Sequence, residues 1–569
     1  MKRLACAILS GGLAVSGLST FATERLTTNE IAQILAQAAS KALEYTNNPV
    51  SQNAVIAVAD REGYIVGVRT VDPNSATNRT FAAQLRNAMC RAGTASYLSS
   101  SQHAFSSRTA GYIVQQHFPV GIENAPNGPL VGVNFSNLSG SDVNRLKDPS
   151  TYDPSQTNGI NGKALPPLIT GGLTGAAGGV PLYKNGVLVG GLGVSGDEDM
   201  GARLETKLIT FGATKATVAM LVTNTLFYEL NISPESVVDP DVDEEVALAG
   251  QVGFAPDRRF WGSKVFVGGI SLAYIYSDPV PAKVVRPLDQ VSYPVPAYPI
   301  VAPPPVEYPP LTLGGVNGEL RQPIMDDPAL HDADASNDTI RGQARLTAAE
   351  VRAILDLGAN RARTTRGGIR LPRGRQMQCF ISVVANPNQD GAPPPVLGTF
   401  CTSPDATRFS WDVAAQKART ALFFSDDTRA FSSRTVGFLA QKFYPPGIIN
   451  TQPGIFLGLQ ERFDNFNYNV QNPLNDAIVT DPTRLPLARV PLDPNLPNGI
   501  TIFPGGFPLY RNGVLIGAVG VSGDGIDQDD IVAASATANF LAPLDIRADR
   551  FSYRGARLPY AKFPRNPAL

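Results

Sequence analysis

The sequence predicts an α+β protein made of two copies of one module, in which helices cover an antiparallel sheet and long loops are inserted. The first observation is an internal repeat: Ala-Phe-Ser-Ser-Arg-Thr at 104–109 returns at 430–435, and Pro-Leu-Tyr-x-Asn-Gly-Val-Leu at 181–188 returns at 508–515. Because both blocks keep nearly the same spacing, they indicate a duplicated domain rather than a solenoid of short repeats. The second observation is a set of hairpin signals, and the third is the helical patterns that flank them; together they predict helices packed on an antiparallel sheet.

Each copy opens with the start signal of a helix. A threonine is followed three residues later by a glutamate, which is the spacing of a capping box, and apolar residues then recur at helical intervals. The residues concerned are Thr27 and Glu30 in the first copy, and Thr347 and Glu350 in the second.

Two hairpins and two further helices follow in each copy. The second hairpin turns on Asn-Gly, a pair that accepts the positive φ angles of a tight turn. The predicted turns are 185–186 and 512–513, the middle helices 81–97 and 411–424, and the last helices 243–254 and 529–540. Each copy therefore follows the order helix, hairpin, helix, long loop, hairpin, helix, and its loop of about 55 residues is unusually long for a connection.

The chain divides into four predicted segments. Lys2 and Arg3 precede an apolar stretch that ends in small residues, which is typical of a secretory signal peptide. A proline-rich stretch between the copies predicts an extended, semi-rigid linker. The segments are a signal peptide at 1–22, module 1 at 23–277 with an insert at about 200–238, the linker at 278–335, and module 2 at 336–569.

Composition limits the classes of function. Hydrophobic residues make up 43% and charged residues 17% of the 569 residues, which favours a folded protein. A formal net charge of −1 gives no electrostatic footprint for nucleic acid. Beyond the leader, no apolar run reaches the roughly 18 residues that span a membrane. We expect a periplasmic or secreted protein without a membrane span.

Two of the four cysteines invite a pairing. Cys379 and Cys401 flank a loop between two apolar runs, so a hairpin would bring them close together. In an oxidising compartment they form either a disulfide or two free core thiols, and the sequence leaves both open. Cys90 lies in a helical pattern and is expected to be a small buried hydrophobe.

The order of the motifs resembles the GlcG/HbpS-like domain family. The motifs are the Leu-Thr-x-x-Glu helix start, the strand ending in Asp-Arg-Glu-Gly at 60–63, Lys-Ala-Arg-Thr-Ala at 417–421, the Asn-Gly hairpin and Gly-Val-Ser-Gly. The resemblance implies small α+β modules associated with haem binding, haem degradation or redox sensing, and it makes haem the implied cofactor. Family members oligomerise, so a fused pair resembles a dimer within one chain, and homo-oligomers of the chain are also expected.

Neither copy has the whole family pattern. Asp-Arg-Glu-Gly at 60–63 has no counterpart in the second copy, and Gly93 stands in the first copy where the second has Arg419. Haem needs an axial ligand, usually His, Cys, Met or Tyr. Of the three histidines, His331 lies in the linker, which leaves His103 and His117 of the first copy as candidate ligands. The alternative is that both are ordinary surface or loop histidines.

Basic residues provide the other binding candidates. Arg108 and Arg434 occupy the same position in the two copies, beside paired serines, where a guanidinium could bind a carboxylate or a haem propionate. The alternative is an arginine that holds the long loop. The resemblance adds Lys417 and Arg419 as ligand contacts under the same two interpretations.

Other chemistries have weak support. Gly-Val-Ser-Gly-Asp at 193–197 and 520–524 departs from the nucleophile elbow of serine hydrolases, because an aspartate replaces the last glycine. Aspartates before the last helices, such as Asp239, Asp241 and Asp243, could hold calcium, but they also suit a helix N-terminus. We expect a binding protein for haem or a related small ligand rather than an enzyme. The alternative is a structural or protein-interaction protein that has lost its ligand.

Overall fold

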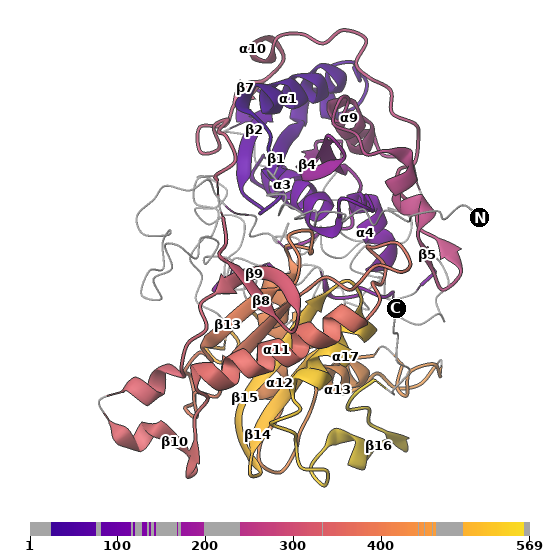
Figure 1. Cartoon of the computed structure of the whole chain (residues 1–569). Helices are drawn as coiled ribbons and strands as arrows, with labels where there is room; N and C mark the ends of the chain where they lie inside the picture. Colours follow the sequence, from indigo (N-terminus) through magenta and orange to yellow (C-terminus); the bar gives the residue numbers. More distant parts are fainter. Residues whose placement is uncertain are drawn as a thin grey trace, which may run out of the picture.

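The structure is a computed structural model. It describes residues 24–75, 81–114, 118–119, 128–133, 136–137, 141–143, 168, 172–197, 239–305, 307–332, 334–441, 443–448, 450–457, 459–461 and 493–562. Figure 1 shows an N-terminal half in indigo and magenta above a C-terminal half in orange and yellow. We use N-terminal half for residues 24–305 and C-terminal half for residues 307–562.

The N-terminal half is built on an antiparallel sheet of strand order β3-β4-β1-β2-β7. Its strands are β1 Val55–Asp60, β2 Ile65–Thr70, β3 Gly179–Lys184, β4 Val187–Ser195 and β7 Tyr293–Pro294. Its helices are α1 Thr28–Ala42, α2 Val50–Asn53, α3 Phe81–Leu98, α4 Ser107–Ile113, α9 Val242–Gly250 and α10 Leu288–Val291. The short strands β5 Phe266–Val267 and β6 Ile270–Ser271 form a separate pair.

The C-terminal half contains an antiparallel sheet of order β14-β15-β12-β13-β9-β8. Its strands are β8 Pro310–Leu313, β9 Val316–Gln322, β12 Cys379–Ala385, β13 Val396–Cys401, β14 Gly506–Arg511 and β15 Val514–Gly523. Its helices are α11 Ala348–Thr364, α12 Ser410–Phe423, α13 Ser433–Leu439, α14 Leu459–Glu461 and α17 Ile526–Ala536. Two short pairs, β10 Thr339–Ile340 with β11 Gln343–Ala344 and β16 Ser552–Tyr553 with β17 Ala556–Arg557, lie outside the sheet. The α+β class predicted from the sequence is confirmed.

Helices cover both faces of each sheet because the central strands carry apolar residues on both sides. In β1, Val55 and Ala57 belong to the core beneath α3, whereas Ile56 and Val58 pack with α1 and α9. This alternation follows from the two-residue period of a strand. The core beneath α3 also includes Phe409, so the two halves share apolar packing.

The predicted helix starts and turns are confirmed. Thr27 and Thr347 each accept a hydrogen bond from the backbone N–H of the glutamate three residues on, and both capping boxes are complete. Asn185 and Asn512 have φ values of 51° and 49° at the tips of the β3–β4 and β14–β15 hairpins. Local sequence therefore places the first helix and the second hairpin of each half.

The predicted linker at 278–335 is only partly an extended connection. Residues 310–322 form β8 and β9, which extend the sheet of the C-terminal half through β13, and β7 adds a short strand to the other sheet. Pairing with the open edge of a sheet satisfies backbone N–H and C=O groups that an extended linker would leave to water. The proline content of this stretch predicted an extended linker and gave no sign that part of it pairs with the sheet edges.

The hairpin predicted around Cys379 and Cys401 forms, but its cysteines are free and buried. Cys401 lies opposite Phe380 in the β12–β13 ladder, so Cys379 is one residue out of step with it. Neighbouring residues of a strand point to opposite faces of the sheet, which separates the two thiols. Of the two alternatives left open by the sequence, the structure has the free thiols.

Most of the two long loops and the predicted helix in the insert at about 200–238 lie outside the described residues. Within the described part of the chain, none of the helices has the length and apolar character needed to cross a membrane.

Glycines allow the middle helix of each half to lie directly on its sheet. A Cβ at Gly193 would lie 2.0 Å from the carbonyl oxygen of Ala88 in α3, and a Cβ at Gly520 would lie 1.9 Å from that of Ala414 in α12. Real contacts of this kind are well above 3 Å, so helix and strand would have to separate.

We therefore expect Gly193→Ala and Gly520→Ala each to lower the free energy of unfolding by about 2 kcal/mol or more, because overpacking forces the backbone apart. Urea denaturation measures this loss. Arg352→Ala, on the exposed side of α11, is the control and should change stability by less than about 0.5 kcal/mol. A glycine variant as stable as this control would contradict the proposed close packing.

Candidate functional site

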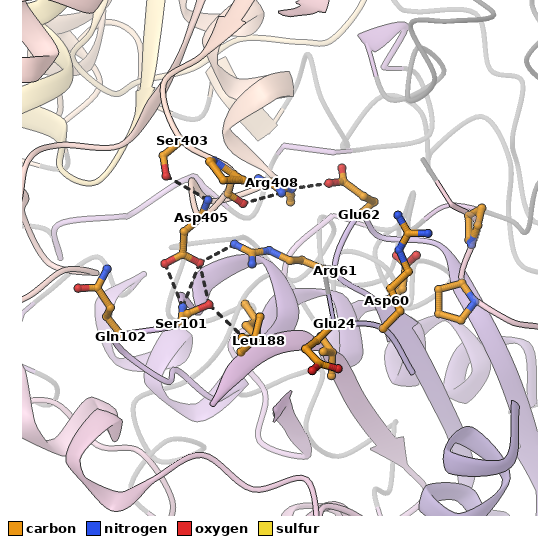
Figure 2. A pocket seen from close by; sticks show the side chains of 16 residues that line it. Glu24, Asp60, Arg61, Glu62, Ser101, Gln102, Leu188, Ser403, Asp405 and Arg408 are labelled. Carbon is orange, nitrogen blue, oxygen red and sulfur yellow. Dashed lines mark hydrogen bonds and ion pairs between the residues drawn. The ribbon is translucent and has the colours of Figure 1, made fainter. Parts of the chain in front are cut away.

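A cavity of about 460 Å³ lies where loops of the two halves meet. Figure 2 shows that its lining comes from the β1–β2 turn, the segment after α3, the start of β4 and the loop after β13. The lining residues are Glu24, Arg25, Asp60, Arg61, Glu62, Ser101, Gln102, Val187, Leu188, Val189, Pro303, Pro304, Ser403, Pro404, Asp405 and Arg408. Apolar walls with a few converging polar groups are typical of a small-molecule site of this size.

Ion pairs between the halves form one wall. Arg61 donates to Asp405 at 2.6 Å, and Arg408 donates to Glu62 at 2.6 Å, as the dashed lines of Figure 2 show. Ser101 adds hydrogen bonds to Asp405 from its backbone N–H at 3.0 Å and from its hydroxyl at 3.1 Å. Burial alone would raise the pKa of Asp405, but Arg61 and the Ser101 N–H outweigh it and keep this pKa low.

Asp60 supplies a second kind of carboxyl group. It is 5% exposed, and its Oδ1 accepts a hydrogen bond from the Tyr64 N–H at 2.9 Å. Burial raises the pKa of Asp60 to about 7, with a further contribution from the charge of Glu62. This carboxyl group can therefore gain or lose a proton near neutral pH at the edge of the cavity.

The two shared arginines lie away from the cavity lining and are bound to carboxylates. Arg108 donates to Glu244 at 2.8 Å, and both side chains are almost fully buried. Arg434 donates to Asp530 at 2.9 Å and to Asp527 at 2.8 Å, with 19% of its side chain exposed. In each half this ion pair fixes the short helix after the middle helix against the last helix.

Lys417 and Arg419 are also engaged within the protein. Lys417 donates to Asp529 at 2.7 Å and to the Val521 carbonyl at 2.9 Å. Arg419 donates to both carboxylate oxygens of Asp142 at 2.7 Å, and Pro394 O accepts from it as well. The four basic candidates therefore have structural partners, and a role for them in binding a ligand stays a prediction.

His103 lies at the junction of the halves, directly after the cavity residue Gln102. Its Nδ1 is 3.3 Å from the carbonyl oxygen of Ile369. Burial lowers the pKa of His103, and the charge of Arg370 lowers it further, which favours the neutral ring. His117 lies outside the described residues, and His331 is exposed beside Asp326.

The predicted acidic cluster is partly assembled. Asp197, Asp241 and Asp243 place carboxylate oxygens within 4.8 Å of one another, whereas Asp239 is not in this group. Arg91 donates to Asp243 at 2.6 Å. Burial, together with the charges of Asp243 and Asp241, raises the pKa of Asp197 well above its usual value. The close approach of these carboxyl groups is therefore accounted for by the Arg91 guanidinium and by burial, which favours the protonated form of Asp197. We assign no metal to the cluster.

Sequence reasoning missed most of the cavity. Glu62 was noted only as part of the Asp-Arg-Glu-Gly motif, and Asp405 had no local pattern around it. Arg408 lies 346 positions from Glu62, and Arg61 lies 344 positions from Asp405. The available signal was that Asp-Arg-Glu-Gly at 60–63 has no counterpart in the C-terminal half of the sequence.

Known proteins offer one family match. A family model described as "Haem degrading protein HbpS-like" matches residues 395–538, from β13 to α17. It supports one HbpS-like domain within the C-terminal half. A solved structure titled "Crystal Structure of PduOC:Heme Complex" is 19% identical, with 35% of this chain and 98% of that chain covered at a TM-score of 0.22. This score supports neither a fold nor a ligand for the chain. No curated protein matches it.

We expect Arg108→Ala to lower the free energy of unfolding by roughly 3–5 kcal/mol, because it leaves Glu244 as an uncompensated buried charge. Arg434→Ala is the matched variant. Its arginine is partly exposed, so its loss should be smaller, roughly 2 kcal/mol. Urea denaturation measures both values. A loss of haemin binding in Arg108→Ala at unchanged stability would instead make this arginine a ligand contact.

We expect Asp60 to make the fold less stable as pH rises from about 4 to about 7. The pKa of Asp60 is about 7 in the folded state but near 3.9 in an unfolded chain, so the folded state binds more protons in this range. Stability then falls by up to about 1.4 kcal/mol per pH unit. Asp60→Asn should remove this contribution.

Denaturation of wild type and Asp60→Asn at a series of pH values tests this expectation. Other buried carboxyl groups titrate alike in both proteins, so the difference between the two curves isolates Asp60. Parallel curves across the range would contradict the raised pKa.

Proposed function

We propose that this chain is a small-ligand-binding protein built from two HbpS-like modules, with its guest held in the cavity between them. The observation that carries the proposal is a ligand-sized cavity walled by both halves and fixed by ion pairs between them. Walls that are held in place before binding lose little entropy when a ligand arrives.

Corresponding contacts support the assignment of 23–277 as a second copy. The strand order β3-β4-β1-β2 of the N-terminal half has the same pattern as β14-β15-β12-β13. Three ion pairs recur at matching positions in the two sheets and their helices. They are Arg108–Glu244 with Arg434–Asp530, Arg91–Asp243 with Lys417–Asp529, and Lys184–Glu30 with Arg511–Glu350.

Haem is the guest that the family match suggests, and the cavity lining does not fit its iron. None of the lining residues is a histidine, cysteine, methionine or tyrosine. His103, next to the lining, fits better. A neutral ring whose Nδ1–H faces a backbone carbonyl keeps the Nε2 lone pair for a metal, and such a carbonyl partner is typical of iron and zinc ligands. Haem through His103 is therefore the second candidate.

The third candidate is a structural or protein-interaction role, favoured by the internal ion pairs of Arg108 and Arg434. We also propose export to the periplasm or beyond, supported by the leader-like residues 1–22 of the sequence. The fragment-binding test of the cavity described next applies whichever of these two proposals holds.

Fragment binding followed by ligand-observed NMR tests the proposed function. Val187 lines the cavity and is half-buried, so Val187→Trp should fill the space and abolish binding of cavity-dependent fragments. Val514, the corresponding first residue of β15, does not line the cavity, and Val514→Trp is the matched control. If every fragment binds wild type and Val187→Trp alike, the cavity is not a ligand site.

A haemin titration followed in the Soret region separates the candidates. Saturation at one haem per chain that is lost in His103→Ala, but kept in Val187→Trp, assigns haem to His103 rather than to the cavity. His117→Ala tests the other predicted ligand in the same way. If haemin gives no saturable shift and no fragment binds in the cavity, the structural or protein-interaction role is the candidate that remains.

A further inference from the structure

Arg25 is the cavity-lining arginine that remains available to a guest. Of the three arginines in the lining, Arg61 is bound to Asp405 and Arg408 to Glu62. The half-buried side chain of Arg25 makes neither an ion pair nor a hydrogen bond with any residue of the described ranges. Its guanidinium therefore offers its donors to the cavity.

The second copy shows what this arginine does when it has a partner. Arg345 precedes the capping threonine of α11, as Arg25 precedes that of α1. Arg345 is 3% exposed, and it donates to the Asp327 carboxylate at 3.0 Å and to the Asn386 carbonyl at 2.8 Å. In the second copy the position is therefore filled by a carboxylate of the chain itself.

The β1–β2 turn gives the same correspondence. Asp60 pairs with Gly190 in the sheet, and Ala385 pairs with Gly517, so Asn386 corresponds to the cavity residue Arg61. Arg25 and Arg345 thus occupy matching places beside matching turns. Within the described residues, no carboxylate pairs with Arg25 as Asp327 pairs with Arg345.

We propose that the guest of the cavity is a small organic carboxylate with an apolar body, whose carboxylate binds Arg25 as Asp327 binds Arg345. This inference rests on the proposed function and adds the class of ligand. Guanidinium and carboxylate match in bidentate geometry, and an arginine without a partner in a partly buried site favours an anionic guest.

The rest of the lining fits such a ligand. Val187, Val189 and Pro303 provide apolar surface for its body. Leu188 adds to this apolar surface.

Phenylacetate and its neutral isostere phenylacetamide are the probes, titrated into the full chain by ligand-observed NMR. We expect phenylacetate to bind the wild type at least about 10-fold more tightly than phenylacetamide does, because a hydrogen bond between two charged groups is stronger than one to a neutral amide. Arg25→Gln should remove this preference, and Arg25→Lys should retain part of it. Arg352→Gln, an equal charge change on exposed α11, should leave it intact.

Equal binding of the two probes, or a preference that survives Arg25→Gln, would overturn the inference. So would a cavity that binds neutral fragments alone, although the proposed function would then stand. Haemin provides a second carboxylate source through its propionates. Competition between haemin and phenylacetate that depends on Arg25 assigns the carboxylate to haem, and its absence assigns it to a free acid.

Discussion

Glu62 connects the two halves, and the geometry of the cavity depends on it. Its carboxylate lies in the β1–β2 turn and accepts hydrogen bonds from Arg408 at 2.6 Å and Arg321 at 3.1 Å. Arg321 is 1% exposed and lies 3.6 Å above the ring of Tyr308. A guanidinium buried this deeply needs a carboxylate partner, because the energy of removing it from water is otherwise not recovered. Arg321 has two such partners, Glu319 of its own strand at 2.6 Å and Glu62 across the junction, so docking of the β1–β2 turn supplies the second carboxylate of this buried guanidinium.

The reverse contacts fix the same junction from the other side. Asp405 of the C-terminal half accepts from Arg61 and from the Ser101 N–H. Arg370 inserts its guanidinium beneath the end of α3, where it donates to the carbonyls of Leu98 at 2.8 Å and Ser99 at 2.7 Å. Each half thus supplies arginines that bind acceptors in the other half. The cavity walls are held by these pairs rather than by a single hinge, which suits a preorganised binding site.

What the sequence could predict follows from the range of each interaction. Capping boxes and Asn-Gly turns are local, so Thr27, Thr347, Asn185 and Asn512 were sufficient to place their elements. The pairing of Arg61 with Asp405 joins residues 344 positions apart, and no local pattern encodes it. The state of the two cysteines also depends on the wider structure, because strand register decides whether their thiols lie on the same face of the sheet. Sequence spacing brought Cys379 and Cys401 to one hairpin, but the register of β12 and β13, set by the whole sheet, put them on opposite faces.

The two halves differ where the cavity forms, and this difference has a structural source. The stretch before α11 contributes Asp327 to Arg345, and it also adds β8 and β9 to the neighbouring sheet edge. These additions supply the C-terminal half with partners from within the chain. Pro303 and Pro304 precede this stretch and line the cavity beside Arg25 instead of pairing with it. Under the proposed duplication, one position is closed and the other is open, and the proposed stoichiometry is therefore one guest per chain.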